Sequence, residues 1–539
     1  MKEKIVNVGS LDDLQENQMK QMSVDELSIL LARWNGMVHA LGGTCPHYGA
    51  PLHQGTLHDG HVICPWHQAK FDLKTGDLLE PCSLDALERY DVRVERGNLH
   101  LSLPAKPSGR RQMLMAEFDP GRDQRTFAVI GGGAVAAAAM EALRQEGFQG
   151  RIVMISQEDR IPYDRPNCSK GYLAGEPASP WVWLDIRSEE FYNWHHIERV
   201  NKRVAVLDVP QRTIQFDDGT TLKPDKVLVA SGAVPRQLDV PGANARNVLL
   251  LRSLSDCNAM IARAGEGKKA VVVGDSFISM EVASSLANRG VQVTIVGLDT
   301  MPFAKVLGED IANLLRKAHE AKGNVFKLGR TVSRFNGGEE ISSATLDDGT
   351  TVACDFAVVG IGVRPATGFV KGAPLNPDGS LEVDGKFRAA EGVYAAGDVA
   401  RYPDPHHEGE RLRIEHWRVA LQQGRAAARA MAGNAKPFDA VPFFWTEQCG
   451  MALAYMGWAP AWDEVIVSGD LSKSDFVAYL AKDNRLLAMV SPHSEKLSAF
   501  EELMHLRRLP PAEAVRGKSQ DEMLHVLRAV EAEGVVEWV

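Results

Sequence analysis

The chain has 539 residues, a length that predicts about three or four domains. Its composition, 45% hydrophobic and 24% charged, is ordinary for a globular protein, and its net charge of −10 argues against nucleic acid or an anionic membrane as a partner. The longest apolar run, near residues 129–140, is too short to cross a bilayer, and the first residues contain no apolar segment of signal-peptide length. Seven scattered cysteines form no disulfide pattern, so a reducing, cytoplasmic location is expected.

Residues 1–104 are predicted to form a small all-β domain that holds a metal centre. Short alternating runs, such as 92–95 and 99–103, are typical of strands. Ahead of them stands Cys45-Pro46-His47, followed after sixteen residues by Cys64-Pro65-Trp66-His67. Two thiols and two imidazoles form the ligand set of a Rieske [2Fe-2S] cluster, in which two histidines replace two cysteines on one iron.

A structural zinc ion is the alternative, because two cysteines and two histidines also suit a tetrahedral zinc site. Zinc fingers usually pair Cys with Cys and His with His along the chain, whereas each loop of this sequence carries one of each. The mixed loops favour the cluster. The candidate metal ligands are Cys45, His47, Cys64 and His67.

After a predicted linker over residues 105–125, the pattern changes to that of a dinucleotide-binding unit. A buried-type strand at 127–130 leads into Gly131-Gly132-Gly133-Ala134-Val135-Ala136, and a helix and a second strand follow. In this G-x-G-x-x-A turn, Gly131, Gly133 and Ala136 allow a pyrophosphate to approach the N-terminus of the helix. The ribose partner expected about twenty residues further on falls at Gln157-Glu158, and the pattern does not decide between the two.

A second unit of the same kind begins with a strand at 270–273. Gly274-Asp275-Ser276-Phe277-Ile278-Ser279-Met280-Glu281 opens its helix, and the next strand ends at Gly297. Two units predict two dinucleotides, FAD and a nicotinamide. Serines replace two of the three motif glycines, and Gly297 stands where an NAD site normally has a carboxylate. A second fold that binds nothing well is therefore the alternative.

Further strand ends are candidate cofactor contacts. Gly232 and Gly362 each lie in a turn that follows a buried-type strand. Gly397-Asp398 ends another strand, and its carboxylate can accept hydrogen bonds from a ribityl chain. Glu415-His416-Trp417 precedes a helix of small residues at 420–427.

From residue 442 onward the sequence predicts an α+β domain, with short β-like runs and a helix at 498–506. The chain is thus predicted to be a multidomain protein with one all-β domain, two Rossmann-like α/β domains and one α+β domain. The predicted boundaries are 1–104 for the Rieske domain, 105–125 for the linker, 126–247 with 366–437 for the FAD-binding domain, 248–365 for the NAD(P)-binding domain, 438–516 for the C-terminal interface domain and 517–539 for a tail, whose residues 519–539 form a helix and an end segment.

Two stretches resemble known families. Residues 44–76 are similar to the Rieske ferredoxins, and Ala50 and Trp66 occupy the places where high-potential Rieske proteins have an extra disulfide, so a low potential is implied. Residues 126–515 resemble the two-dinucleotide flavoproteins, in the branch of apoptosis-inducing factors and oxygenase-coupled ferredoxin reductases. The motifs that carry this resemblance are Ile161-Pro162-Tyr163-Asp164-Arg165-Pro166, Ser169-Lys170 and Glu415-His416-Trp417. Nearly the whole chain resembles the Rieske-fused, apoptosis-inducing-factor-3-like oxidoreductases.

This resemblance implies several roles. Arg165 and Lys170 would contact FAD, with Lys170 close to the flavin ring, and Val204 would touch the adenine through its backbone. Asp398 would hold the ribityl chain, while Glu415, His416 and Trp417 would line the flavin. Glu281 would lie near the nicotinamide, beside the candidate nucleotide-binding residues Gly274, Ser276, Phe277, Ile278 and Gly362.

The predicted function is an NAD(P)H oxidoreductase that passes electrons from a nicotinamide to FAD, then to the Rieske cluster and then to an unidentified acceptor, with a protein among the candidates. The cofactors carry this chemistry, and no catalytic side chain is required. A modest preference for NADH is expected because Leu298 and Asp299, rather than Arg or Lys, follow Gly297, and Asp299 is a candidate for a partial substitute for the missing carboxylate. Gly297→Glu is expected to sharpen this preference. Cys168 stands alone in sequence, which argues against thiol–disulfide chemistry.

Two alternatives remain open from the sequence. One is a redox-sensing protein in which NADH and flavin set a conformation that recruits a partner. The other makes the Rieske domain an input for electrons rather than an output. Neither nucleic acid nor a membrane is expected as a partner, and the chain is expected to be a monomer or a homodimer.

Overall fold

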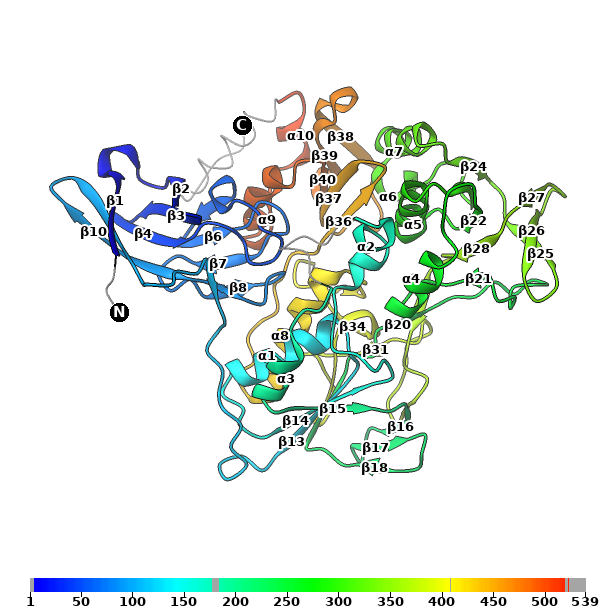
Figure 1. Cartoon of the computed structure of the whole chain (residues 1–539), viewed down its shortest axis with the longest axis horizontal. Coiled ribbons are helices and arrows are strands. Elements are labelled where there is room, and N and C mark those ends of the chain that lie inside the picture. Colours follow the sequence, from blue (N-terminus) through cyan, green and yellow to red (C-terminus); the bar gives the residue numbers. More distant parts are fainter. Residues whose placement is uncertain (1–3, 177–183, 408, 519–521, 523–539) are drawn as a thin grey trace.

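The computed structural model describes residues 4–176, 184–407, 409–518 and 522. Four domains meet at the centre of the molecule (Figure 1): an all-β N-terminal domain in blue, two α/β domains and a β-rich C-terminal domain in orange and red. The helix and end segment predicted for residues 519–539 lie outside the described residues, apart from Glu522. Within the described part of the chain, no helix has the length and apolar character needed to cross a membrane.

The N-terminal domain consists of two antiparallel sheets, in the orders β1-β11-β10-β4-β3-β2 and β5-β6-β7-β8. In β11 every second side chain is buried, as expected of a strand with one face on the core. Its strands are β1 (Lys4–Ser10), β2 (Met19–Val24), β3 (Leu27–Trp34), β4 (Met37–Gly42), β5 (Thr56–His58), β6 (His61–Ile63), β7 (Lys70–Asp72), β8 (Leu78–Glu80), β9 (Ala86–Leu87), β10 (Arg89–Glu95) and β11 (Asn98–Leu103).

The first α/β domain is built on the sheet β15-β14-β13-β19-β33-β32, which is parallel except for β32. Helices α1 and α8 pack against each other, and α8 starts before the predicted range 420–427 and ends after it. The elements are β13 (Thr126–Ile130), α1 (Ala134–Gln145), β14 (Arg151–Ser156), α2 (Gly171–Ala174), α3 (Glu189–Trp194), β15 (Ile197–Asn201), β16 (Val204–Asp208), β17 (Thr213–Phe216), β18 (Thr221–Leu222), β19 (Lys226–Val229), β20 (Ala233–Pro235), β29 (Val363–Pro365), β30 (Val370–Lys371), β31 (Leu381–Glu382), β32 (Arg388–Ala390), β33 (Val393–Ala395), β34 (Ala400–Pro403), β35 (Arg411–Leu412) and α8 (Trp417–Ala432).

The second α/β domain has the parallel sheet β21-β28-β22-β23-β24, next to a three-stranded meander, β25-β26-β27. Strand β22 is an almost wholly apolar run because helices or loops cover both faces of a parallel sheet. The elements are β21 (Val248–Leu249), α4 (Leu254–Ile261), β22 (Lys269–Val273), α5 (Phe277–Asn288), β23 (Gln292–Gly297), α6 (Ala304–Leu307), α7 (Glu309–Ala321), β24 (Val325–Leu328), β25 (Val332–Gly337), β26 (Ile341–Leu346), β27 (Thr351–Ala353) and β28 (Phe356–Val359).

The C-terminal domain is an antiparallel sheet, β36-β37-β40-β39-β38, with two helices. The helix predicted at 498–506 is α9. The elements are β36 (Phe443–Gln448), β37 (Met451–Gly457), β38 (Glu464–Asp470), β39 (Asp475–Lys482), β40 (Arg485–Ser491), α9 (Ser498–His505) and α10 (Ala512–Val515).

The segment between the N-terminal domain and the first α/β domain lies along both of them. Its strand β12 (Arg110–Arg111) pairs with β9. The Ala116 N–H then donates to the Arg144 carbonyl oxygen at 2.8 Å, and the Asp119 N–H donates to that of Gln149 at 2.9 Å. The predicted linker over 105–125 is therefore an attached connection.

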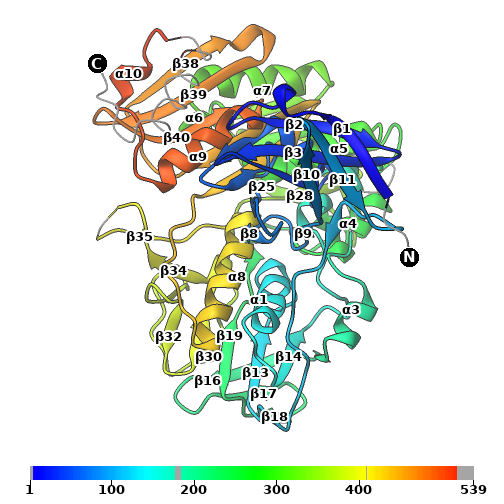
Figure 2. The same cartoon turned by 90° about the vertical axis from the view of Figure 1, so that its left-hand side faces the viewer.

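The N-terminal domain is docked on α8 and on the C-terminal domain (Figure 2). Arg418 of α8, which is fully buried, joins the three parts. Its guanidinium donates to the carbonyl oxygens of Gln68 at 2.7 Å and Pro81 at 2.9 Å, and to the Glu501 carboxylate of α9 at 2.6 Å. This contact positions the two cysteine–histidine loops against the rest of the molecule.

Candidate functional site

Two loops of the N-terminal domain carry the predicted metal ligands. Cys45 and His47 follow β4, and Cys64 and His67 lie between β6 and β7. Each loop is closed by a 2.8 Å hydrogen bond from the backbone N–H of its cysteine. The Nδ1 atoms of His47 and His67 face each other at 3.1 Å, and the two thiols are in hydrogen-bond contact. The four ligands thus form a nitrogen pair and a sulfur pair.

The surroundings of these ligands suit metal binding. Burial lowers the pKa of His47 to about 3 and the pKa of His67 well below its usual value, so both imidazoles are neutral. Burial raises the pKa of Cys45 well above its usual range. Burial also opposes ionisation of Cys64, but hydrogen bonds from Cys45 and from three backbone N–H groups of residues 66–69 outweigh it and lower the pKa of Cys64. Such hydrogen bonds to sulfur help to set the potential of an iron–sulfur cluster.

The arrangement of the four ligands in two pairs distinguishes a [2Fe-2S] site from a zinc site. A structural zinc ion needs four ligands around one point, whereas a Rieske cluster takes two thiolates on one iron and two imidazoles on the other. The donor set therefore fits a [2Fe-2S] cluster held by Cys45, His47, Cys64 and His67.

One tryptophan of the C-terminal domain separates this centre from the predicted flavin residues. The ring of Trp445, in β36, lies 4.4 Å from that of His67 and 6.3 Å from that of His47, centroid to centroid. The Nζ atom of Lys170 lies 5.9 Å from the centre of the same Trp445 ring. Trp445 thus contacts a cluster ligand and a predicted flavin residue at once.

A second bridge runs through Tyr48. Its ring stacks on that of His47 at 4.0 Å, and its hydroxyl donates to the carboxylate of Asp164 and accepts from Asn167 Nδ2 at 3.1 Å. Asp164 directly precedes Arg165, and burial raises the pKa of Asp164 to about 6. The domain that holds the cluster is therefore hydrogen-bonded to the segment expected to contact FAD.

The first dinucleotide unit has the backbone that a pyrophosphate needs. Gly131 has a φ of +139°, and a side chain there would clash with the carbonyl oxygen of Ala230. Gly133 is the N-cap of α1, and Ala136 is fully buried inside that helix. Because neither glycine carries a side chain and the N-terminus of α1 lies open to this turn, these residues fit the FAD pyrophosphate.

A third glycine lies beside Asp398, the residue expected to hold the ribityl chain. Gly232 has a φ of +67°, and a Cβ atom there would lie 2.5 Å from Arg252 Nη2 and 3.6 Å from Asp398 Oδ2. Arg252 itself donates to Asp398 at 3.1 Å. Gly232 and Asp398, which are far apart in sequence, are thus brought together as predicted residues of one site, and Arg252 joins them.

Gln157 and Glu158, the two candidates for the ribose partner, directly follow the carboxyl end of β14. Glu158 accepts from Arg165 at 2.6 Å and from the Tyr163 hydroxyl at 2.7 Å, whereas the side chain of Gln157 is exposed. Glu158 is thereby held at the carboxyl end of β14, next to the Arg165 guanidinium. Val204 lies at the start of β16 and is buried.

Lys170 and Glu281 form the most buried ion pair of the predicted flavin and nucleotide residues. The Glu281 carboxylate, of which 2% is exposed, accepts from Lys170 at 2.8 Å, from Ser169 at 2.6 Å and from Thr446 at 2.7 Å. Gln448 donates to the Thr446 hydroxyl at 2.8 Å. This network joins both α/β domains to β36 of the C-terminal domain.

The three residues Glu415, His416 and Trp417 face different surroundings. His416 is the N-cap of α8, and its ring lies 4.7 Å from that of Phe444. Burial lowers the pKa of His416 to about 3, and its Nδ1 atom has no protein partner, so it is free to meet a cofactor. Trp417 packs on the core of the first α/β domain. Glu415 is exposed and pairs with Arg413, so the structure does not bring it toward the others.

The second dinucleotide unit keeps the required backbone despite its serines. Gly274 has a φ of +116° and Gly362 one of +93°, conformations that favour glycine. Ser276 is the N-cap of α5. Phe277 stacks on Phe303 at 4.7 Å, and 49% of Ile278 is exposed at the start of the helix. The unit therefore presents an open helix N-terminus with an apolar wall.

Several residues of this site had no predicted role. Tyr48, Asp164 and Thr446 hold the domains together, and Trp445 lies between the two centres. The aromatic run Phe443-Phe444-Trp445 in an alternating strand is the sequence signal that could have indicated a buried contact on both faces. The partners of Tyr48 are more than a hundred positions away, and no local pattern reports them.

Cys168 does not stand alone, contrary to what its spacing suggests. Its thiol is in hydrogen-bond contact with that of Cys257 in α4, and this contact, together with burial, raises the pKa of Cys168. A C-x-x-x-x-C search finds only pairs that are close in sequence, so it misses this one. The same contact lowers the pKa of Cys257.

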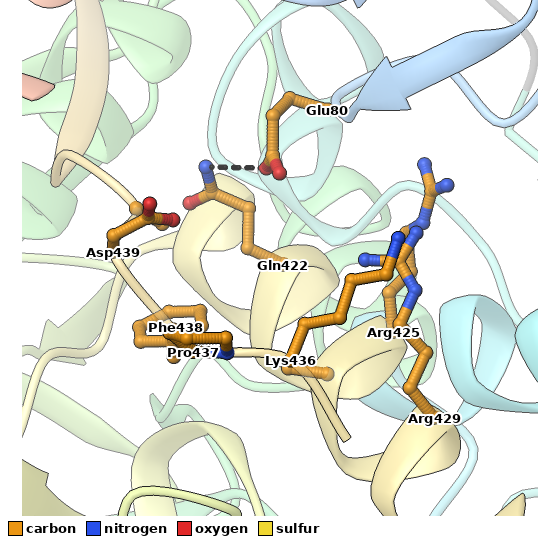
Figure 3. Close-up of a pocket in the computed structure, with 10 residues that line it drawn as sticks. Glu80, Gln422, Arg425, Arg429, Lys436, Pro437, Phe438 and Asp439 are labelled. Carbon is orange, nitrogen blue, oxygen red and sulfur yellow. Dashed lines mark hydrogen bonds between the residues drawn. The ribbon is translucent and has the colours of Figure 1, made fainter. Parts of the chain in front are cut away.

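A small open pocket lies where β8 meets α8. Figure 3 shows Arg425, Arg429 and Lys436 together on one side of it, and Gln422 donating to Glu80 at 3.1 Å on the other. Its lining includes none of the predicted cluster or dinucleotide residues. The pocket therefore belongs to the seam between domains rather than to the redox site.

Each part of the site lies in a domain that matches a known protein family. The pyridine nucleotide-disulphide oxidoreductase family matches residues 125–424, the Rieske [2Fe-2S] domain matches residues 4–91, and the reductase C-terminal domain matches residues 443–521. The chain belongs to the pyridine nucleotide-disulphide oxidoreductase family. It is an FAD-containing flavoprotein that carries a Rieske [2Fe-2S] domain, so the predicted fold class is confirmed.

Individual relatives define its kind more closely. The chain is 36% identical to apoptosis-inducing factor 3 of Homo sapiens, over 90% of this chain and 81% of that protein. It is 31% identical to the probable ferredoxin reductase CtmF of Castellaniella defragrans, over 70% of this chain and 93% of that protein. The crystal structure of the ferredoxin reductase for the CYP199A2 system of Rhodopseudomonas palustris covers 74% of this chain and 100% of its own, with a TM-score of 0.69 and 28% identity. This chain is a ferredoxin-reductase-like NAD(P)H oxidoreductase with its own Rieske domain, as the resemblance implied.

Proposed function

We propose that this protein passes electrons from NADH through FAD to its own Rieske cluster, and from there to an acceptor outside the chain. One observation carries the proposal: the Trp445 ring lies 4.4 Å from the ring of the cluster ligand His67, and the Lys170 ammonium lies 5.9 Å from the centre of the same Trp445 ring. Two relatives are ferredoxin reductases by name, which supports an iron–sulfur centre as the acceptor of the flavin's electrons, and this chain has such a centre in its own Rieske domain. The final acceptor is then a further redox protein.

The chain's residues hold and insulate the cofactors rather than react. When bound, FAD accepts a hydride and releases single electrons, which the cluster carries one at a time. Glu281 positions Lys170 at the flavin end, and Trp445 fills the space between the domains and excludes water from it. The Tyr48–Asp164 hydrogen bond and the buried Arg418 keep the Rieske domain in place.

The test uses the full-length protein and follows flavin and cluster separately by anaerobic stopped-flow absorbance with NADH. Trp445→Leu is expected to leave flavin reduction unchanged and to slow cluster reduction by about tenfold, which corresponds to about 1.4 kcal/mol of activation free energy. Cys64→Ser is expected to abolish the cluster signal and to leave flavin reduction intact.

The matched control is Trp194→Leu, because Trp194 is a tryptophan of α3 that is 80% exposed and far from this contact in sequence. It is expected to change neither rate. Cluster reduction at the native rate in Trp445→Leu, or cluster reduction by NADH in protein stripped of FAD, would show that electrons follow another route.

A further inference from the structure

The carboxyl end of β23 is the place where an NAD-binding unit normally carries an acidic residue. That carboxylate accepts hydrogen bonds from the hydroxyls of the adenosine ribose. In this chain the position is Gly297, the last residue of β23. Unless another group supplies the carboxylate, the unit lacks its usual ribose partner.

The side chain of Asp275 occupies the space above Gly297. A Cβ atom built on Gly297 would lie 2.5 Å from Asp275 Oδ2 and 2.8 Å from both Asp275 Cβ and Cγ. The backbone N–H of Asp299 donates to the same Oδ2 atom at 3.1 Å, which fixes the carboxylate at the strand end. Asp275 directly follows Gly274, the first glycine of the phosphate-binding turn, so it reaches this position from the opposite side.

The end of β23 forms a corner with Asp275, Gly297, Asp299, Lys305 and Arg330. The charges of this corner do not suit a phosphate. Lys305 pairs with the Asp299 carboxylate. Arg330, whose N–H donates to the Gly297 carbonyl oxygen at 2.9 Å, pairs through its side chain with Asp348 at 3.0 Å. Both cations of the corner are thus engaged by carboxylates, while the Asp275 carboxylate accepts from the backbone N–H of Asp299.

We propose that Asp275 binds the adenosine ribose hydroxyls and sets the preference for NADH over NADPH. Its carboxylate takes the place of the one that Gly297 lacks. It also repels the 2′-phosphate that distinguishes NADPH, because two negative charges in one pocket oppose each other. The acid has moved from the end of β23 to the glycine turn that precedes α5. This inference rests on the proposed function, in which NADH is the preferred donor.

The test measures dissociation constants of NAD⁺ and NADP⁺ on the oxidised, FAD-loaded full-length protein by isothermal titration calorimetry, so that no turnover is involved. Asp275→Asn, which keeps the size of the side chain, is expected to weaken NAD⁺ binding about tenfold and to leave NADP⁺ binding unchanged or tighter. The matched control, Asp299→Asn, removes the neighbouring carboxylate and is expected to change the NAD⁺ constant by less than about twofold, while it frees Lys305 and is expected to tighten NADP⁺ binding. An unchanged NAD⁺ constant in Asp275→Asn, or a tenfold loss in Asp299→Asn instead, would overturn the assignment.

A second pair of variants uses the contact itself. Gly297→Glu alone forces two side chains into one space, so it is expected to weaken NAD⁺ binding, contrary to the sequence-based expectation that it sharpens NADH preference. Asp275→Gly combined with Gly297→Glu returns the acid to the strand end and is expected to restore most of the native NAD⁺ affinity. A double variant no better than Gly297→Glu would overturn the proposal.

The same titrations separate this inference from the proposed donor. If the native protein binds NADP⁺ more tightly than NAD⁺, the proposed NADH preference itself is wrong. If the native protein prefers NAD⁺ and Asp275→Asn keeps that preference, NADH remains the donor and only the role of Asp275 is wrong.

Discussion

At the scale of single residues, the Glu281 carboxylate determines how the flavin-facing end of the site is held. A carboxylate that is 2% exposed is stable only when charged or hydrogen-bonding partners replace the lost water. Lys170 supplies a positive charge, and the hydroxyls of Ser169 and Thr446 supply two further donors. All three donors point toward Glu281, so its position fixes that of the Lys170 ammonium.

Loss of one donor should therefore be measurable. Thr446→Val removes the hydroxyl and keeps the shape of the side chain, and it is expected to lower the free energy of unfolding by about 1–3 kcal/mol, because one oxygen of a buried carboxylate loses its partner. Urea unfolding of the FAD-loaded protein measures this change. Thr446→Ser keeps the donor and should retain more stability than the valine variant; the opposite order would show that packing of the methyl group dominates.

At the scale of elements, close packing of α1 on α8 explains why both helices are rich in small residues. A Cβ atom on Gly424 of α8 would lie 2.6 Å from the Val135 carbonyl oxygen and 3.1 Å from its Cα atom in α1. Side chains larger than hydrogen at this crossing would separate the helices. The backbones must approach closely because α1 starts at the glycine turn expected to bind the pyrophosphate and α8 starts directly after its N-cap His416, so their packing places both ends of the predicted flavin site.

Gly424→Ala should consequently destabilise the protein, although alanine is the better helix former. The clash is expected to cost about 1–3 kcal/mol, more than the gain in helix propensity of about 1 kcal/mol. Differential scanning calorimetry and the FAD content of the purified protein measure the effect. Gly385→Ala is the matched control, since a Cβ atom there meets nothing within 4 Å. Equal melting temperatures for both variants would contradict this account of the helix crossing.

At the scale of the whole molecule, the Rieske domain is docked rather than tethered. Its contact is built around Arg418, a fully buried guanidinium that satisfies carbonyl oxygens of the Rieske domain and the Glu501 carboxylate together. Burial raises the pKa of the Glu501 carboxyl group, and the charge and hydrogen bond of Arg418, followed by the charge of Lys70, counteract this effect. The interface therefore depends on the pair being complete.

Removal of one partner should loosen the interface. Arg418→Ala leaves Glu501 buried without its cation, and it is expected to cost about 3–5 kcal/mol and to expose the segment 105–125 to proteolysis. Arg418→Met with Glu501→Leu removes both charges and should cost less. Limited proteolysis and the rate of cluster reduction by NADH measure the two effects. A single variant that resists proteolysis and keeps the native rate would mean that other contacts hold the domain.

The sequence by itself determined the parts of this protein whose signals are local. The ligand loops at Cys45 and Cys64 and the two glycine turns are short patterns in which backbone shape and donor type are set by neighbouring residues. The order of the domains followed from these patterns, and family comparison confirms it.

Only the tertiary structure decided how these parts meet. The contacts of Trp445 with His67, of Tyr48 with Asp164 and of Cys168 with Cys257 join positions far apart in the chain, so no local pattern encodes them. The position of Asp275 is the clearest case that could not be predicted from the sequence. The sequence showed that Gly297 lacks a carboxylate, but only the approach of the glycine turn to the end of β23 places the Asp275 carboxylate over it. Packing of elements distant in sequence, driven by burial of their apolar faces, brings such residues together.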